Sequence, residues 1–220
     1  MDSELKKIKK LGSYSYYLSK DNKFFVKECK GERELLEKEY LNLKKIWNKL
    51  NIEDFDSIEP IDFNAERERL ISRYIDAEPI ITTLQPEIYF KFGQKLNEFH
   101  KKGYSHGHLE FNDILYKNGK LYLTDLPRLN EEPALLDIVT LDLSIKIFKL
   151  KKPWLWKKYK KCLDAFFKGY QFLLSKEYIN LFREKLMSRI IDHFNDKEIY
   201  SKLEGIILLF LLKTGLIRWI

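Results

Sequence analysis

The sequence predicts an α+β protein in which a small β-rich part comes first and a larger helical part follows. Residues 7–28 contain short runs in which apolar and polar residues alternate, a pattern typical of strands joined by turns. From about residue 133 onward the pattern is mostly helical. The 220 residues suffice for one large domain or for two small lobes that share a core.

The β-rich part is expected to contain five strands and one helix. Three strands are predicted within residues 7–28, with a turn at residues 20–22 between the last two. A helix is predicted over residues 32–50, and two further strands over residues 57–63 and 68–75.

One position of this predicted helix is unusual. Leu36, Leu43, Ile46 and Leu50 recur at helical spacing, and Glu39 lies on the same apolar stripe. Burying a carboxylate without a partner is costly. We therefore expect Glu39 to have a partner.

The pattern changes near residues 76–80, where "DAEPI" forms a turn that contains Pro79. We place the boundary there, so that residues 1–77 form the β-rich part and residues 78–220 the helical part of one overall domain. The helical part should begin with a helix over residues 86–102.

A polar loop follows that helix, and its sequence, "YSHGHLEFNDIL" at residues 104–115, is the most informative stretch of the chain. A core strand or helix would not place two histidines, a glutamate, an asparagine and an aspartate between apolar residues. A zinc site of His100, His106 and His108 has irregular spacing and no partner cluster, so we do not expect one. Two short strands, "ILYKNG" and "KLYLTD", follow the loop and are joined by a turn at residues 117–119.

This order of elements resembles the protein-kinase-like fold. The loop of such proteins has the pattern H-G-D-L-x-x-x-N-I-L, and here residues 106–115 are "HGHLEFNDIL". The preceding "LNEFHKKGYSHG" resembles the helix that leads into that loop. The resemblance is greatest to small bacterial lipopolysaccharide-core (Kdo/heptose) kinases and to aminoglycoside-phosphotransferase-like kinases, and it covers about residues 8–150. It implies a small N-lobe and a larger helical C-lobe.

The chain departs from that pattern at several positions. His108 replaces the catalytic aspartate, and Asp113 replaces the metal-binding asparagine. The D-F-G triplet becomes Asp125-Leu126-Pro127, and the glycine-rich loop is reduced to Gly12.

The resemblance implies roles for residues on both sides of a nucleotide cleft. Lys27 would hold the phosphates of ATP, with Gly12 nearby, and Glu39 would pair with Lys27. Asp125 and Asp113 would bind Mg²⁺, since hard cations prefer oxygen ligands. Asp113 has a second interpretation as a residue that caps a helix or turn.

The hinge between the lobes would present backbone groups near Tyr74 and Ala77 to the adenine. His106 would brace the loop. Asp142 would brace the loop backbone from within the helical lobe, with Asp137 as the competing choice.

The role of His108 stays open. A neutral imidazole can accept a proton near pH 7, so His108 could act as the base. Glu110 could act in its place. In the third case, the chain binds nucleotide without turnover, as a pseudokinase.

The resemblance to lipopolysaccharide kinases implies a phosphotransferase that acts on a sugar hydroxyl of a lipid-linked glycan, with the pseudokinase as the alternative. Few residues separate Asp125 from the next predicted helix, which argues against a regulated protein kinase and favours a small-molecule or lipid-linked acceptor.

The net charge of +7 favours anionic partners. Residues 146–161, "KIFKLKKPWLWKKYKK", are rich in lysine, with Trp154, Trp156 and Tyr159 interleaved. This segment is either a solvated helix face or, together with residues 206–220, a surface for anionic lipid. Only basicity supports a nucleic-acid partner, which we do not expect.

The chain start, "MDSELKKIKKLG", lacks the apolar core of a signal peptide, and the apolar run from Ile206 to Leu212 is too short to span a bilayer. Cys29 and Cys162 lie far apart, so no disulfide framework is indicated. We expect a cytoplasmic protein that associates peripherally with the inner face of a membrane.

Overall fold

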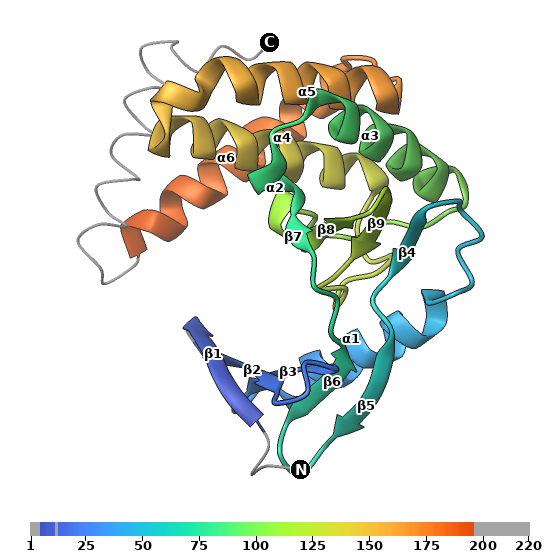
Figure 1. Cartoon of the computed structure of the whole chain (residues 1–220). Coiled ribbons are helices and arrows are strands. Elements are labelled where there is room, and N and C mark those ends of the chain that lie inside the picture. The colour runs from blue at the N-terminus through green and yellow to red at the C-terminus, as the bar shows by residue number, and fades with distance from the viewer. Residues whose placement is uncertain (1–4, 12, 196–220) are drawn as a thin grey trace.

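Figure 1 shows a computed structural model of the chain, with an antiparallel sheet and one helix below a larger helical part. The structure describes residues 5–11 and 13–195. This arrangement confirms the predicted α+β fold. Gly12 and the tail at residues 206–220 lie outside the described residues.

The first sheet has five antiparallel strands in the order β1-β2-β3-β6-β5. The turn predicted at residues 20–22 joins β2 to β3, and Ser19 Oγ accepts the backbone N–H of Phe24 at 2.9 Å across it. The strands are β1 Leu5–Leu11, β2 Tyr14–Ser19, β3 Phe24–Cys29, β5 Pro60–Asn64 and β6 Arg69–Arg73.

Helix α1, Arg33–Ile46, packs against β5 and β6. The apolar stripe of the sequence is its buried face, and Glu39 is buried with it. The helix ends before the predicted residue 50, because Trp47 leaves the helical conformation with φ −54° and ψ 128°.

The second sheet has the order β4-β9-β8-β7. The single strand predicted over residues 57–63 is in fact two strands. β4 pairs in parallel with β9, whereas β5 belongs to the first sheet and begins at Pro60, which has no N–H to continue a ladder. The bounds are β4 Phe55–Ser57, β7 Glu78–Pro79, β8 Ile114–Lys117 and β9 Lys120–Leu123.

The helical part is built around α4, whose residues 136–145 are all buried. Its helices and 3-10 turns are α2 Ile80–Thr83, α3 Pro86–Lys101, η2 Phe111–Asp113, α4 Ala134–Lys151, η3 Pro153–Leu155, α5 Trp156–Tyr170 and α6 Lys176–Asn195. None of the described helices combines the length and apolar character needed to cross a membrane.

Helices α3 and α5 approach each other closely through two glycines. A Cβ atom at Gly93 would lie 2.3 Å from the Phe166 carbonyl oxygen, and one at Gly169 would lie 2.1 Å from the Phe90 carbonyl oxygen. Any larger residue at either position would force the helices apart. This contact fixes α3, which leads into the polar loop.

Candidate active site

Lys27, on β3, joins the two parts of the molecule. Its Nζ atom lies 2.7 Å from Glu39 Oε2 of α1 and 2.6 Å from Asp125 Oδ1, just after β9. The side chains of Lys27 and Glu39 are 11% and 4% exposed, whereas that of Asp125 is 51% exposed. The buried carboxylate on the stripe of α1 therefore has a cation as its partner.

Burial and ion pairing shift the pKa values of Lys27 and Glu39. Burial disfavours the Lys27 cation, but Glu39 and Asp125 outweigh burial and raise the pKa of Lys27 above its usual range. Burial raises the pKa of Glu39 to about 7, although Lys27 acts in the opposite direction. Lys27 thus stays protonated throughout the physiological pH range.

Asp125 occupies a conformation that few residue types tolerate. Its φ is +58°, in the left-handed region, where Asp and Asn are enriched among residues other than glycine. The next residue, Leu126, is buried, and its carbonyl oxygen accepts a hydrogen bond from Asn42 Nδ2 of α1 at 2.8 Å. Helix α1 is therefore held to the segment after β9 directly by Asn42 and indirectly through the Glu39–Lys27–Asp125 bridge.

Asp113 lies in η2, at the end of the polar loop. Its Oδ2 atom accepts the backbone N–H of Glu110 at 2.8 Å, so Asp113 is a capping residue, as one interpretation of the sequence proposed. Asp113 also lines the same cavity as Lys27 and Asp125. Burial, and then the negative charge of Asp125, raise the pKa of Asp113 well above its usual range.

The cavity that contains these groups has a volume of about 550 Å³. Tyr74 and Ala77 also line it, although the Tyr74 N–H donates to the Lys23 carbonyl and the Ala77 N–H to the Ile75 carbonyl, both at 2.8 Å. The other lining residues are Ile8, Tyr16, Phe25, Glu39, Ile58, Leu70, Ser72, Arg73, Ile75, Pro79, Leu115 and Thr124.

His108 does not line this cavity. Its side chain is 50% exposed, and its Nε2 atom lies 3.6 Å from Glu110 Oε1. The two candidate catalytic residues are therefore neighbours on the polar loop, next to the buried cluster rather than within it.

His106 and Gly107 hold the polar loop against the segment after β9. His106 is buried, and its Nε2 atom lies 2.8 Å from the Thr124 carbonyl oxygen. Burial lowers the pKa of His106, so the ring is neutral and Nε2 carries the hydrogen that is donated. Gly107 has φ +87°, and a Cβ atom there would lie 2.5 Å from the Arg128 carbonyl oxygen. Only glycine fits this position.

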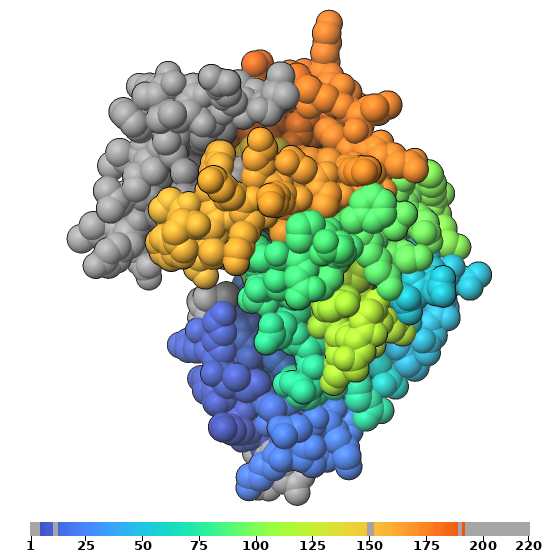
Figure 2. Space-filling view, turned by 45° about the horizontal axis from the view of Figure 1, so that its top comes forward, coloured from blue at the N-terminus to red at the C-terminus, as the bar shows by residue number. Residues whose placement is uncertain are grey.

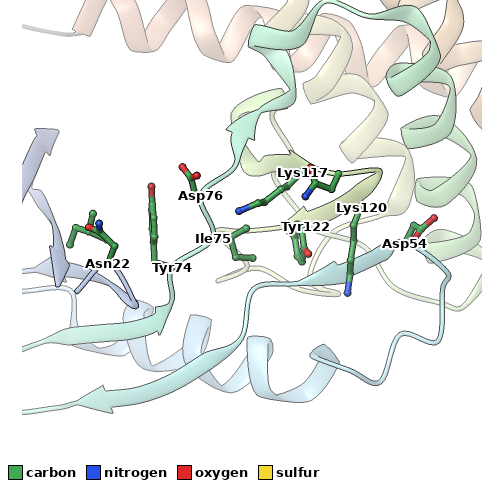
Figure 3. Close-up of a pocket in the computed structure, with 10 residues that line it drawn as sticks. Asn22, Asp54, Tyr74, Ile75, Asp76, Lys117, Lys120 and Tyr122 are labelled. Atoms are coloured by element: carbon green, nitrogen blue, oxygen red, sulfur yellow. The ribbon is translucent and has the colours of Figure 1, made fainter. Parts of the chain in front are cut away.

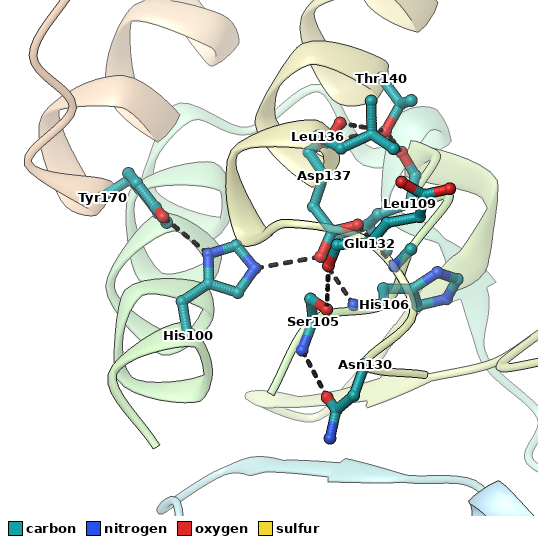
Figure 4. A network of polar contacts seen from close by, with 11 residues as sticks. His100, Ser105, His106, Leu109, Asn130, Glu132, Leu136, Asp137, Thr140 and Tyr170 are labelled. Atoms are coloured by element: carbon teal, nitrogen blue, oxygen red, sulfur yellow. Dashed lines mark hydrogen bonds and ion pairs between the residues drawn. The ribbon is translucent and has the colours of Figure 1, made fainter. Parts of the chain in front are cut away.

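The residue that braces the loop from α4 is Asp137, and the expectation for Asp142 is wrong. Asp137 accepts the N–H of His106 at 2.7 Å and that of Gly107 at 2.9 Å (Figure 4). Asp142 instead contacts Lys146 Nζ and the Tyr178 hydroxyl. Five residues turn an α-helix by about 140° beyond a full turn, so the two carboxylates point in different directions.

The sequence did not reveal the residues that support Asp137. His100 of α3 was considered there only as a zinc ligand. Its Nε2 atom lies 3.1 Å from Asp137 Oδ2, and its Nδ1 atom lies 2.6 Å from the Tyr170 hydroxyl (Figure 4). Thr140 adds a bond from its hydroxyl to the Leu109 carbonyl oxygen at 2.7 Å. The sequence signal for Thr140 was a polar residue in the otherwise apolar helix α4, whereas His100 lies among other polar residues of α3.

A second cavity, of about 990 Å³, adjoins the first across the hinge and shares Tyr74 and Ile75 with it (Figure 3). Its other walls come from polar turns, including Asp76, Lys117 and Lys120. None of the candidate catalytic or metal-binding residues lines it. Of these two cavities, only the smaller one is lined by Lys27, Glu39, Asp113 and Asp125.

Sequence comparison gives little further information. No family model matches the chain. A probable bifunctional tRNA threonylcarbamoyladenosine biosynthesis protein of Methanosarcina barkeri is 36% identical over 66 residues. The match covers 30% of this chain and 12% of that protein.

Structural comparison is decisive for the fold. A choline/ethanolamine kinase family protein from Mesorhizobium loti has a TM-score of 0.63 at 11% identity, over 98% of this chain and 90% of that one. The amicoumacin kinase hAmiN, in complex with AMP-PNP and Ca²⁺, has a TM-score of 0.65 at 10% identity, over 97% and 88% of the two chains. The aminoglycoside phosphotransferase APH(2")-IIa, in complex with streptomycin and ATP, has a TM-score of 0.58 at 12% identity, over 94% and 90%.

The chain has the protein-kinase-like fold. Its N-lobe is the five-stranded sheet with α1, and its C-lobe is the helical part with the second sheet. The predicted boundary at residue 77 falls in the segment between β6 and β7. No group of three or more His, Cys, Asp or Glu side chains suited to a metal occurs among the described residues.

Proposed function

We propose that this chain is a phosphotransferase that binds ATP in the cleft between its lobes and transfers a phosphoryl group to a hydroxyl. The observation that carries the proposal is the Lys27 bridge to Glu39 and Asp125 in a cavity between the lobes. Phosphoryl transfer depends mainly on positioning and charge neutralisation. Lys27 would hold the phosphates, and Glu39 would keep its ammonium group in place.

The donor set of the cavity fits Mg²⁺. Asp113 and Asp125 provide carboxylate oxygens in one cavity, and hard divalent cations prefer such ligands. Burial and the nearby Asp125 charge raise the pKa of Asp113, and a bound cation would favour its carboxylate form. The ion would also neutralise phosphate charge.

We propose that His108 is the base. Its Nε2 atom would accept the proton of the acceptor hydroxyl, and the Glu110 carboxylate, 3.6 Å away, would stabilise the imidazolium that forms. Both side chains are accessible enough to meet an acceptor from solvent, with exposures of 50% and 24%.

The acceptor that we propose is a sugar hydroxyl, either of a small molecule or of a lipid-linked glycan. Only residues 126–133 separate Asp125 from α4. Such a short segment provides no extended platform for a peptide substrate, whereas a compact acceptor needs none.

A pseudokinase is the second candidate, and the position of His108 favours it. The charged residues that line the cavity support nucleotide binding, but His108 does not line the cavity and cannot supply a fixed negative charge. Such a protein would bind ATP without turnover.

Thermal melting with ATP, in the presence and absence of Mg²⁺, tests binding, and release of ADP in the presence of sugar acceptors tests turnover. We expect a Mg²⁺-dependent rise in Tm that Lys27→Ala abolishes. Lys23→Ala is the matched control, because Lys23 is exposed and pairs only with Asp21 among the described residues. No rise in Tm for the wild-type chain would refute nucleotide binding.

Turnover separates the two candidates. ADP release that His108→Ala abolishes supports the phosphotransferase with His108 as base. Nucleotide binding without turnover, in both the wild-type chain and His108→Asp, supports the pseudokinase.

A further inference from the structure

The turn between α4 and α5 exposes two tryptophans among lysines. Trp154 is 75% exposed and Trp156 is 50% exposed. We use the name α5 basic patch for these two tryptophans and the exposed lysines around them, which are Lys152, Lys157, Lys158, Lys160 and Lys161.

The patch is smaller than the segment that the sequence indicated. Tyr159 is only 2% exposed, and its ring packs against Phe148 with 6.5 Å between the centroids. Lys146 points inward to Asp142, with Nζ 2.7 Å from Oδ2. The buried face of α5 fixes which side of the helix remains outside, so the patch lysines that belong to α5 share one outward face.

The five lysines of the patch and Trp154 are exposed. None of these five lysines forms an ion pair within the described part of the chain. A tryptophan that is three-quarters exposed leaves most of its apolar surface in water. Exposed lysines are well hydrated, whereas the apolar surface of Trp154 is unfavourable in water.

We propose that the α5 basic patch docks the protein on an anionic lipid surface. Tryptophan rings favour the level of lipid headgroups, and lysines around them pair with acidic headgroups. Single-stranded nucleic acid is usually held in a basic groove with stacking residues. Neither described cavity is lined by a residue of the patch, so the projecting turn fits a flat surface better than a strand.

The N-lobe supplies cations on the same side. Figures 1 and 2 show the start of α5, in amber, on the side of the molecule where β1, in blue, also lies. In β1, Lys6, Lys7, Lys9 and Lys10 are all exposed. A membrane that touches the patch would therefore also attract the N-lobe. This arrangement suits a lipid-linked acceptor, but docking requires no turnover.

Vesicle flotation with the full chain tests the proposal. We expect binding to vesicles of phosphatidylcholine with phosphatidylglycerol, weak binding to pure phosphatidylcholine, and release at high salt. Lys157→Ala combined with Lys161→Ala should weaken binding roughly 30-fold. Trp154→Ala combined with Trp156→Ala should weaken it at least roughly tenfold and remove a blue shift of tryptophan emission on binding.

Two control variants match these changes. Lys101→Ala with Lys102→Ala removes the same charge from the exposed end of α3, and Leu173→Ala removes an apolar side chain that is 85% exposed at the other end of α5. Both should bind vesicles like the wild-type chain. Lys27→Ala should also bind normally, which separates docking from the proposed nucleotide site.

Three outcomes would overturn the proposal. The first is equal binding to neutral and anionic vesicles. The second is an equal loss of vesicle binding in the patch variants and the control variants. The third is tight, patch-dependent binding of short RNA or DNA by a protein that does not bind vesicles. Circular dichroism of each variant establishes that it is folded.

Discussion

Lys27 and Asp125, 98 residues apart in the sequence, form an ion pair of 2.6 Å across the cleft. Lys27 contacts Glu39 from the other side, at 2.7 Å. The two carboxylates differ in environment, because Glu39 is buried whereas Asp125 is half-exposed. Their contributions to stability and to ligand binding should therefore differ.

Glu39→Gln should lower the free energy of unfolding by about 3 kcal/mol, because it removes the buried counter-charge of a buried cation. Asp125→Asn should lower it by less than about 1 kcal/mol, because solvent screens a half-exposed partner. Urea unfolding measures both. If Asp125→Asn were the more destabilising change, the buried pair would not be the main anchor of Lys27.

Asp113→Asn should make the protein more stable at alkaline pH and leave its stability unchanged near pH 4. The folded-state pKa of Asp113 lies well above the unfolded value of 3.8. The contribution of the protonated Asp113 side chain to the free energy of unfolding is therefore fully present below pH 3.8. It is lost as the pH rises through the folded-state pKa. Asparagine keeps an acceptor for the Glu110 N–H and never ionises. Urea unfolding across this pH range measures the difference. A constant difference at all pH values would contradict the buried titration.

Asp137→Asn should release the polar loop, whereas Asp142→Asn should not. Only Asp137 accepts the N–H groups of His106 and Gly107. Hydrogen exchange at these two amides should become faster by at least roughly tenfold in Asp137→Asn. In Asp142→Asn the exchange should instead increase near Tyr178, which contacts Asp142. Fast exchange of the loop amides in Asp142→Asn would reinstate the original expectation.

Gly107→Ala should destabilise the protein much more than Gly103→Ala. Both glycines have positive φ, +87° and +81°, so both substitutions strain the backbone by about 1 kcal/mol or more. Only at Gly107 would the added Cβ atom collide with backbone, the Arg128 carbonyl, whereas Gly103 faces open space. Thermal unfolding should show a Tm loss at Gly107 that is at least about twice that at Gly103. Equal losses would mean that the loop shifts away from Arg128 at little cost.

The sequence predicted the α+β fold well because strong local patterns specify it. The stripe of α1 predicted both the buried face and the unusual position of Glu39, since helical periodicity reports burial directly. The resemblance of the polar loop to a known pattern drew attention to His106 and Asp113, whereas the composition of the loop alone assigned them no role.

The remaining differences come from tertiary packing. Helix α4 is apolar on almost every side, so its pattern could not show whether Asp137 or Asp142 faces the loop. Tyr159 lies among lysines in the sequence, yet the fold buries its ring. The break between β4 and β5 depends on a partner, β9, that lies more than 60 residues later in the chain. A local sequence pattern does not show which distant element a residue will contact in the fold.

The pairing of β4 with β9 constrains how the molecule can be divided. β4 precedes the hinge but adds a parallel strand to the sheet of the C-lobe, with Phe55 opposite Leu121 and Ser57 opposite Leu123. A recombinant fragment that starts after the hinge would leave one edge of β9 bare, and bare edges promote self-association. The two lobes should therefore be expressed together, and a cut in the loop between β5 and β6 should be tolerated better than a cut at the hinge.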